Sequence, residues 1–275
     1  MTMANSIFDV VSSRQRCIKY RRRILDISQK VSALHAAPAF SCVEMTDVIY
    51  HGLMFRYQGN NYRDVFLMSK GHGCMTQYVL LEDIGILDEE ELNRYCTPEG
   101  FLGAHPDRGN PGIEASTGSL GHGMGMAVGM AYAEKLKQTE SKVFVVLSDG
   151  ELQEGSSWEG AMMAANLNLD NLLIFIDLND FGGMHRMSEY HQAFYPLKEK
   201  FEAFGWEAMI VNGHDAESIY KATCSRSGAK PFVLICNTVK GRGVSYMENV
   251  PIWHYRSPTK EEYLKAINEL TEVFE

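Results

Sequence analysis

The run KVFVVLSDGELQEGSSWEGAMMAANLNLDNLLIFIDLND, residues 142–180, decides the fold class of this chain. Two short apolar stretches, at residues 143–147 and 172–176, flank a segment whose apolar residues recur with helical spacing. Apolar runs of this length, bounded by turn residues, are typical of strands buried on both faces. Similar runs occur at residues 207–211 and 232–238. The predicted fold is therefore α/β, with a parallel sheet flanked by helices on both faces.

Helical patterns fill most of the remaining chain. They are expected at about residues 14–34, 44–56, 74–85, 121–138, 156–168, 195–203, 215–227 and 259–272. The last helix has its own start signal, because Thr259 and Glu262 form a capping-box pattern. No internal repeat or low-complexity linker interrupts the sequence, so we expect a single domain over residues 1–275, with the helical segment of about residues 1–60 packed on it.

Composition and charge exclude several classes of function. The chain has 275 residues, of which 45% are hydrophobic and 22% charged, as in ordinary soluble proteins. The net charge is −9, and we expect the basic run Arg21, Arg22 and Arg23 to lie on a solvated helix face. Nucleic acid is therefore not an expected partner. No stretch reaches the ~18 apolar residues of a membrane helix, so we expect no membrane partner. The cysteines form no C-x-x-C pair, so we expect reduced thiols in a cytoplasmic protein.

Asp149 and Asn179, thirty residues apart, are predicted at the carboxyl ends of two neighbouring parallel strands, the edge where ligands bind. Mg²⁺ prefers a few protein oxygens together with water and phosphate oxygens. The Asp149 carboxylate, the Asn179 amide oxygen and the Phe181 carbonyl would supply half of such a shell, and Gly150 would let the backbone approach a phosphate. An Asp-Gly pair after a strand is more often only a turn, so both interpretations stay open at this point.

The wider sequence resembles the transketolase family, whose thiamine diphosphate signature is Gly-Asp-Gly followed about thirty residues later by Asn. Blocks similar to the family's, in the family's order, are SKGHGCMTQYVLLEDIGIL (69–87), AHPDRGNPGIEASTGSLGHGMGMAVGMAYAEKL (104–136), VNGHDAESI (211–219) and TVKGRGVSYMENVPIWH (238–254). The resemblance covers most of the chain from about residue 20 onward. It implies the domain that binds the diphosphate of thiamine diphosphate and its Mg²⁺.

The resemblance also implies roles for individual residues. The expected cofactor-binding residues are His72, Gly118, Leu120, Asp149, Gly150 and Asn179, with Asp149, Asn179 and the Phe181 carbonyl as the Mg²⁺ ligands. The expected catalytic residues are the channel histidines His35, His105 and His254, together with Glu154, a buried glutamate that joins the two cofactor sites of a dimer. Imidazoles suit a sugar channel because they donate to hydroxyls, accept from them and move protons near neutral pH.

Two further motifs can be explained by a structural role as well as by a functional one. We favour a structural role for His214 and Asp215, with Asp215 as a helix N-cap. Gly121, Gly125 and Gly129 recur on one helix face, although each glycine costs roughly 1 kcal/mol relative to alanine. They fit either a tight contact within the fold or a helix packed against another subunit.

The resemblance implies a partner subunit. Thiamine diphosphate enzymes of this family use a glutamate from a following pyrimidine-binding domain, and this sequence ends at Glu275, near the family's boundary between the two domains. A second chain with the pyrimidine-binding and C-terminal domains is therefore expected, in an α2β2 heterotetramer. The implied activity is that of a transferase, moving a two-carbon ketol unit from a ketose phosphate to an aldose acceptor.

Departures from the family pattern gather near the expected substrate. The segment LHAAPAFS (34–41) keeps His35 and Ser41 but lacks the family's glycines, and FGGM (181–184) replaces the usual segment after the metal-binding asparagine. Ser148 stands for a glycine and His122 for a glutamine. A branched or otherwise modified sugar phosphate is therefore an open alternative as substrate.

Other functions also remain as alternatives. One is a different split thiamine diphosphate enzyme, similar to deoxyxylulose phosphate synthase or to the α subunit of a 2-oxo acid dehydrogenase. Another is a noncatalytic scaffold, which would have no use for a polar crevice of this kind. A nicotinamide enzyme is disfavoured, because no G-x-G-x-x-G motif joins a predicted strand to a helix.

Overall fold

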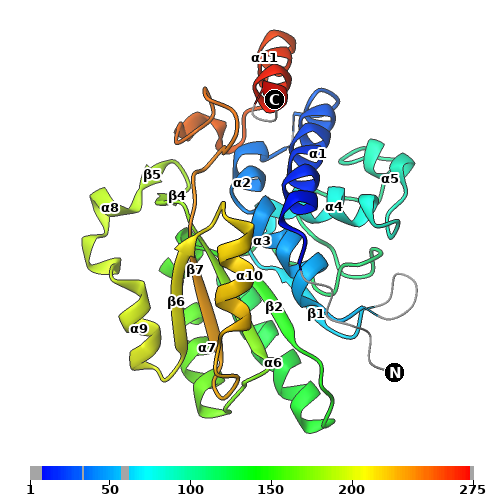
Figure 1. The fold of residues 1–275 in the computed structure, drawn as a ribbon. Coiled ribbons are helices and arrows are strands. Elements are labelled where there is room, and N and C mark those ends of the chain that lie inside the picture. Colours follow the sequence, from blue (N-terminus) through cyan, green and yellow to red (C-terminus); the bar gives the residue numbers. More distant parts are fainter. Residues whose placement is uncertain (1–7, 33, 57–61, 273–275) are drawn as a thin grey trace.

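The computed structural model describes residues 8–32, 34–56 and 62–272, and its centre is a five-stranded parallel sheet between two layers of helices (Figure 1). The strands are β1 (Val65–Met68), β2 (Val143–Ser148), β3 (Leu172–Leu178), β6 (Glu207–Asn212) and β7 (Phe232–Asn237). Their order across the sheet is β1-β2-β3-β7-β6, and every neighbouring pair is parallel. The predicted fold class is confirmed.

Four of the five sheet strands lie where the sequence predicts them, and β1 was missed. β1 has only four residues and pairs Val65 with Val143, so its place in the sheet is set by a strand that follows it by nearly eighty residues. A second, antiparallel pair of β4 (Phe181–Gly182) and β5 (His185–Arg186) was also not predicted. This short hairpin contains the FGGM segment that departs from the family pattern.

Both faces of the sheet are covered, which explains the continuous apolar runs. On one face, Phe144 and Val146 pack with α1 (Val10–Ser28), α3 (Val43–Val48), α4 (Cys74–Asp83) and α10 (Ala216–Cys224). On the other face, Val145 and Leu147 pack with α6 (His122–Leu136), α7 (Gly155–Asn166) and α9 (Leu197–Ala203). Alternate residues of one strand thus enter two separate cores.

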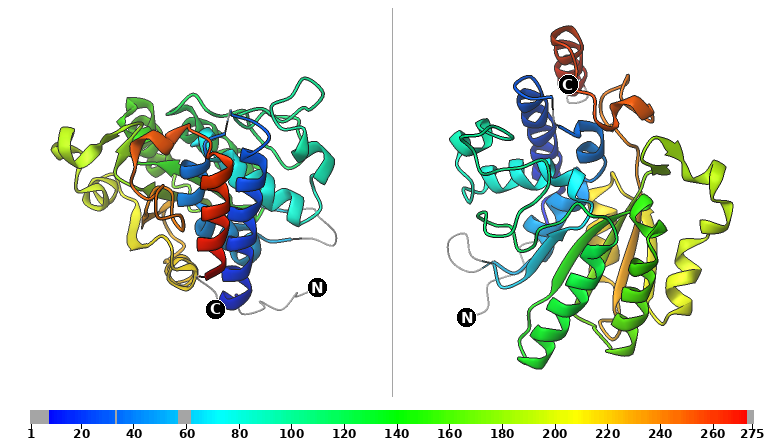
Figure 2. Two further views of the ribbon diagram at one scale, coloured as in Figure 1. Left: turned by 90° about the horizontal axis from the view of Figure 1, so that it is seen from above. Right: turned by 180° about the vertical axis from the view of Figure 1, so that it is seen from behind.

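The remaining helices are short or peripheral. They are α2 (Ala36–Ser41), α5 (Glu89–Asn93), α8 (Met187–Tyr190), α11 (Lys260–Glu272), the 3-10 turns Gly71–Gly73, Gly150–Gln153, Gln192–Phe194 and Pro251–His254, and the π-helical turn Ile49–Leu53. Figure 2 (left) shows α11 lying alongside α1, near the other end of the chain. A hydrogen bond of 2.7 Å from the Tyr263 hydroxyl to Asp26 Oδ1 joins the two helices. No helix in the described part of the chain is both long and apolar enough to span a bilayer.

Two predicted helix caps are confirmed. The Thr259 amide donates to Glu262 Oε2 at 2.8 Å, and the Glu262 amide donates to Thr259 Oγ1 at 3.3 Å, which is the capping box. Asp215 caps α10 by accepting from the amides of Glu217 and Ser218. His214 Nε2 accepts from the Val239 amide at 2.8 Å, so its Nδ1–H donates to Glu44 Oε2 at 3.0 Å. The structural role predicted for His214 agrees with these contacts.

The prediction for Arg21 was wrong, because this residue is buried rather than solvated. Its side chain forms a two-pronged ion pair with Glu44, at 2.6 Å and 2.9 Å, and also donates to the Phe40 carbonyl at 2.9 Å. α3 and α10 cover this side of α1, which helical periodicity alone could not reveal. Burial opposes ionisation of Glu44, but Arg21 and His214 outweigh it and lower the pKa of Glu44 to about 2.

Replacing Glu44 by glutamine should destabilise the chain at pH 7 by about 3–5 kcal/mol, because it leaves Arg21 as a buried, unpaired cation. The lowered pKa of Glu44 means that its charge contributes fully above its ordinary pKa near 4.5 and is lost as the pH falls toward about 2. The difference in unfolding free energy between wild type and E44Q, measured in urea, should therefore stay constant above about pH 4.5 and become smaller as the pH falls from there toward about 2. Glu261→Gln, at an exposed position of α11, is the control and should change stability by less than about 0.5 kcal/mol. An unchanged stability of E44Q at pH 7 would contradict the assignment.

Candidate active site

The predicted metal-binding residues meet at the carboxyl edge of the sheet, where β2 and β3 end. Asp149 is fully buried, and Asn179 and Phe181 are 7% and 4% exposed. Asp149 Oδ1 accepts from the Gly150 amide at 2.8 Å, and Oδ2 accepts from the Asp180 amide at 2.6 Å. Asn179 Oδ1 accepts from the Phe181 amide at 3.1 Å. One carboxylate, one amide oxygen and one backbone carbonyl are thus brought to a single point of the fold.

The electrostatics of Asp149 suit a cation. Burial, helped by the nearby negative charge of Asp177, raises the pKa of Asp149 to about 8. A divalent cation beside the carboxylate would favour its ionised form and offset the cost of burying it. Among the described residues, no cluster of three or more His, Cys, Asp and Glu side chains is arranged to hold a metal. A site here would have the mixed oxygen set that Mg²⁺ accepts.

Glycines hold the backbone segments of this edge close together. A Cβ on Gly150 would lie 3.1 Å from the Phe181 carbonyl oxygen and 3.3 Å from the Gly182 Cα, so Gly150 allows the β4 segment to approach the turn after β2. Gly118 has a φ of +123°, and a Cβ there would lie 2.6 Å from the His105 ring. Gly118 and His105, both predicted site residues, are therefore in contact.

A cavity of about 100 Å³ opens at this edge. It is lined by Pro38, His72, Leu120, Ser148, Gly150, Asn179, Phe181, Gly183, Lys240 and His254. Six of these ten residues were predicted from the sequence, and they come from segments spread over more than half of the chain. The sheet brings them together because its strands are parallel and all end at the same edge.

Four histidines form a cluster, and two of them, His72 and His254, line the cavity. The ring centroids of His35 lie 6.0 Å from those of His72 and His105 and 5.5 Å from that of His254, while His72 and His254 are 5.4 Å apart. Burial, with neighbouring positive groups, lowers the pKa of His35 to about 4 and that of His254 to about 3. Burial also depresses the pKa of His72. These three imidazoles are neutral at pH 7, so each carries one donor and one acceptor nitrogen.

His35 Nδ1 is buried and has no hydrogen-bond partner among the described residues. A buried polar nitrogen without a partner is costly, and a polar ligand in the cavity would satisfy it. The histidine cluster therefore fits a hydroxyl-rich substrate.

A fully buried ion pair between Lys70 and Asp177 lies beneath the cavity, and the sequence did not predict it. Lys70 also donates to the Pro38 carbonyl at 2.8 Å. Asp177 accepts from Ser41 Oγ at 2.6 Å, from the Thr238 hydroxyl and from Asn179 Nδ2 at 3.1 Å. The last of these bonds fixes the Asn179 amide with its oxygen turned toward Phe181. Lys70 lies in the SKGH block, but no sequence pattern indicates its partner.

Lys240 is a second missed residue, and it lies in the wall of the cavity. Its Nζ donates to the Gly183 carbonyl and to His254 Nδ1, both at 2.8 Å, and lies 4.9 Å from the centre of the Phe181 ring. Burial and the nearby Lys70 lower the pKa of Lys240 to about 8. Because His254 Nδ1 accepts this bond, the ring proton of His254 is on Nε2. Lys240 therefore sets the tautomer of a predicted channel histidine and adds a cation to the site.

Glu154 is exposed in the single chain, and its predicted burial between the two cofactor sites of a dimer stays a prediction. The buried carboxylate of this segment is Glu151, whose Oε1 accepts from Ser69 Oγ at 2.5 Å and from the Gly121 amide at 3.0 Å. Burial raises the pKa of Glu151, and its Oε2 has no partner among the described residues. Within the described chain, Glu151 rather than Glu154 is therefore the enclosed carboxylate.

The glycine repeat at Gly121, Gly125 and Gly129 was expected to mark either a tight contact within the fold or a contact with another subunit. The structure decides against the first interpretation for two of these glycines. Gly125 and Gly129 are exposed, and a Cβ on either would meet no atom within 4 Å, so a tight contact within the fold is wrong for both. Gly121 is different: its φ is +85°, and a Cβ there would lie 2.5 Å from the Glu154 Cβ. Only Gly121 is required by contacts inside the chain.

Comparison with known proteins identifies the family. Residues 13–270 match the family described as transketolase, thiamine diphosphate binding domain, and the chain belongs to this family. It is 36% identical over 262 residues to one of the subunits of apulose-4-phosphate transketolase from Phocaeicola vulgatus, covering 94% of this chain and 93% of that protein. It is 33% identical over 259 residues to a 6-deoxy-6-sulfo-D-fructose transketolase subunit of a Clostridium species, covering 91% and 93%.

Among solved structures, transketolase from Campylobacter jejuni superposes with a TM-score of 0.85 at 27% sequence identity. The match covers 94% of this chain but 43% of that one. The fold of this chain therefore corresponds to part of a longer transketolase, whereas the subunit of apulose-4-phosphate transketolase is matched over nearly its full length.

Replacing Lys70 by methionine should lower the free energy of unfolding by about 3–5 kcal/mol, because Asp177 would be left as a buried, unpaired anion. The double variant Lys70→Met/Asp177→Asn should recover part of this loss, since it removes both charges. Urea unfolding of the full chain measures both effects. Lys230→Met, at an exposed position between α10 and β7, is the matched control and should change stability by less than about 0.5 kcal/mol. Equal stability of K70M and wild type would show that the pair does not hold this edge of the sheet.

Proposed function

We propose that this chain is the cofactor-binding subunit of a two-subunit transketolase that acts on a ketose phosphate and needs a second chain for activity. The observation that carries the proposal is one crevice lined by Asn179, Phe181 and the two neighbours of the buried Asp149, together with His72 and His254 of the neutral histidine cluster. An oxygen set for a metal beside groups for sugar hydroxyls is the combination that such an enzyme requires. Membership of the transketolase family and the names of relatives, which describe them as subunits, support it.

The proposed cofactors are thiamine diphosphate and Mg²⁺. Asp149, Asn179 and the Phe181 carbonyl would hold the metal, and Gly150 and His72 would lie by the diphosphate. Gly118 and Leu120 would contact the aminopyrimidine; Leu120 lines the cavity and Gly118 packs on His105. Bound thiamine diphosphate supplies a nucleophilic carbon and an electron sink for breaking a carbon–carbon bond.

The residues of this chain would bind and orient the sugar. His35, His105 and His254 exchange hydrogen bonds with its hydroxyls, and the unpartnered Nδ1 of His35 is free to do so. Lys240 keeps the proton of His254 on Nε2, from which it can be donated to a substrate oxygen. The fixed tautomer and the buried setting prepare these groups before the substrate arrives.

The proposed partner carries the pyrimidine-binding and C-terminal domains, with the glutamate that activates the cofactor. Relatives of similar length are named as one subunit of their enzyme, which implies a second subunit in those enzymes. Exposed residues of α6 and α7 support contact with other chains: Gly125 and Gly129 lie in α6, and Met163 of α7 is 50% exposed. Glu154 would become buried in such a contact, in an α2β2 heterotetramer. We place the enzyme in the cytoplasm, where its six free cysteines persist as thiols.

The proposed substrate is a branched or otherwise modified ketose phosphate. The segment Ala36–Ser41 forms α2, and its alanines and Pro38 take the place of the family's glycines beside the cavity. The β4–β5 hairpin forms another part of the wall. Two relatives are named for apulose 4-phosphate and for 6-deoxy-6-sulfo-D-fructose, so proteins of this size occur in enzymes for unusual sugars. Decarboxylation of pyruvate by the assembled enzyme would instead favour one of the alternative thiamine diphosphate activities.

Native mass spectrometry of the tagged chain, purified from its own host with thiamine diphosphate and Mg²⁺ supplied, tests the partner. We expect a second subunit to copurify, with two cofactors in each assembly. Substantial ketol transfer by the pure chain alone would contradict the requirement for a partner.

Asp149→Asn should weaken binding of thiamine diphosphate and Mg²⁺ to the assembled enzyme by about 100-fold or more, because the metal loses its charged ligand. The fold should persist, since asparagine has the same shape and removes a carboxylate that is costly to bury. Calorimetric titration measures the affinity, and thermal unfolding verifies the fold. Asp170→Asn, outside the crevice, is the control and should bind as wild type does. Unchanged affinity of D149N would remove Asp149 from the metal site.

A further inference from the structure

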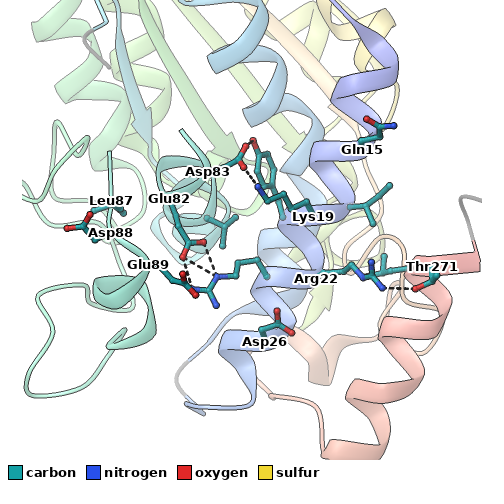
Figure 3. A pocket seen from close by; sticks show the side chains of 15 residues that line it. Gln15, Lys19, Arg22, Asp26, Glu82, Asp83, Leu87, Asp88, Glu89 and Thr271 are labelled. Carbon is teal, nitrogen blue, oxygen red and sulfur yellow. Dashed lines mark hydrogen bonds and ion pairs between the residues drawn. The ribbon is translucent and has the colours of Figure 1, made fainter. Parts of the chain in front are cut away.

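A hollow of about 940 Å³ outside the cofactor crevice is bordered by α1, α4, α5 and α11 (Figure 3). Two of the three cationic side chains that line it are in ion pairs, Lys19 with Asp83 and Arg23 with Glu82. The third, Arg22, donates to a threonine hydroxyl of α11 at 2.8 Å. The cations of this hollow are therefore bound within the chain and offer no unmet charge to an anionic ligand.

The cofactor crevice, in contrast, contains a hydroxyl whose proton is not used within the described part of the chain. Ser148 is the last residue of β2 and lines the cavity directly before Asp149. It is 4% exposed, and it stands where the family's signature has a glycine. Its hydroxyl is therefore a polar group that the usual signature lacks.

The hydrogen bonds around Ser148 leave its O–H proton free. A hydroxyl can donate one hydrogen bond and accept two. Ser148 Oγ accepts from the Glu151 amide at 3.2 Å, which holds the side chain at the turn after β2. Asp177 is the register partner of Ser148 in β3, but this carboxylate already accepts from Lys70 and from three other side chains. Among the described residues, the Ser148 hydroxyl donates no hydrogen bond of its own.

The position of Ser148 places it beside the proposed metal and diphosphate. Asp149, the next residue, is the proposed charged ligand of Mg²⁺, and Gly150 lines the same cavity as Ser148. Asn179 and Lys240 line it as well, so an amide and a cation belong to the same wall. A diphosphate bound to this metal would therefore share the cavity with the Ser148 hydroxyl.

We propose that Ser148 is a further cofactor-binding residue, whose hydroxyl donates a hydrogen bond to a phosphate oxygen of thiamine diphosphate. Hydrogen bonds to ionised acceptors are about twice as strong as those between neutral groups. Because the Glu151 amide already holds Ser148 Oγ, the hydroxyl is oriented before the cofactor binds. This inference rests on the function proposed above and adds a residue to its cofactor site.

A purely structural role for Ser148 makes a different prediction. In that role its oxygen only satisfies the Glu151 amide, and its replacement would affect stability without a specific effect on the diphosphate. Ser157 provides the matched control. It is fully buried, its Oγ donates to the Glu151 carbonyl at 3.2 Å in the same turn, and it does not line the cavity. Ser157→Ala therefore removes a buried hydrogen bond of this turn but no group of the crevice.

The test is calorimetric titration of the assembled enzyme with thiamine diphosphate and, separately, with inorganic diphosphate, both in excess Mg²⁺. Ser148→Ala should weaken the binding of both ligands by about 10-fold, because each loses a hydrogen bond to a charged oxygen. Ser148→Thr keeps the hydroxyl and should recover most of the wild-type affinity. Ser157→Ala should bind both ligands as wild type does. Thermal unfolding of each variant without ligand measures the structural effect separately.

Wild-type affinity of S148A for thiamine diphosphate would overturn the inference and leave the proposed function standing. An equal loss of affinity in S157A would also overturn it, because the effect would then come from the turn and not from the hydroxyl. A loss for thiamine diphosphate without a loss for inorganic diphosphate would contradict the contact with phosphate. Failure of the wild-type assembly to bind thiamine diphosphate would instead contradict the proposed function itself, and this inference with it.

Discussion

The buried ion pair between Lys70 and Asp177 is the interaction on which the site depends. Lys70 follows β1 and Asp177 lies in β3, so the pair spans β2 beneath the end of the sheet. Asp177 also binds Ser41 of α2, Thr238 after β7 and Asn179. One carboxylate thus connects segments from much of the chain at the edge where ligands bind. Two charges are buried at high cost, and their hydrogen bonds offset it.

The pair also organises the charges around it. Asp177 adds to the effect of burial on Asp149 and raises its pKa, while Lys70 adds to the effect of burial on Lys240 and lowers its pKa. The crevice therefore holds a carboxylate that would gain from a cation and imidazoles that stay neutral. A site for a metal, a diphosphate and a sugar needs this separation, because the charged ligand and the neutral hydroxyls require different partners. Both environments arise from the same dry, enclosed edge of the sheet.

Some polar and glycine residues of the single chain are exposed without an internal contact that explains them. Glu154 and the glycine face of α6 have no covering segment within the described fold, whereas Glu151 close by is fully enclosed. Exposed glycines in a helix cost stability without an internal contact to explain them. The proposed contact with further chains would give them a function, and the family includes proteins named as subunits.

The sequence by itself determined the α/β class, four of the five sheet strands, the two helix caps, and the meeting of Asp149 with Asn179. Each of these follows from local patterns of apolar residues, turn residues and strand ends. Only the tertiary structure decided that β1 joins the sheet, that Arg21 is buried, and that Glu151 rather than Glu154 is enclosed within the chain. It alone revealed the partners of Lys70 and Lys240. Burial and pairing depend on residues far away in the sequence. A local sequence pattern does not show which distant segment packs against a given residue.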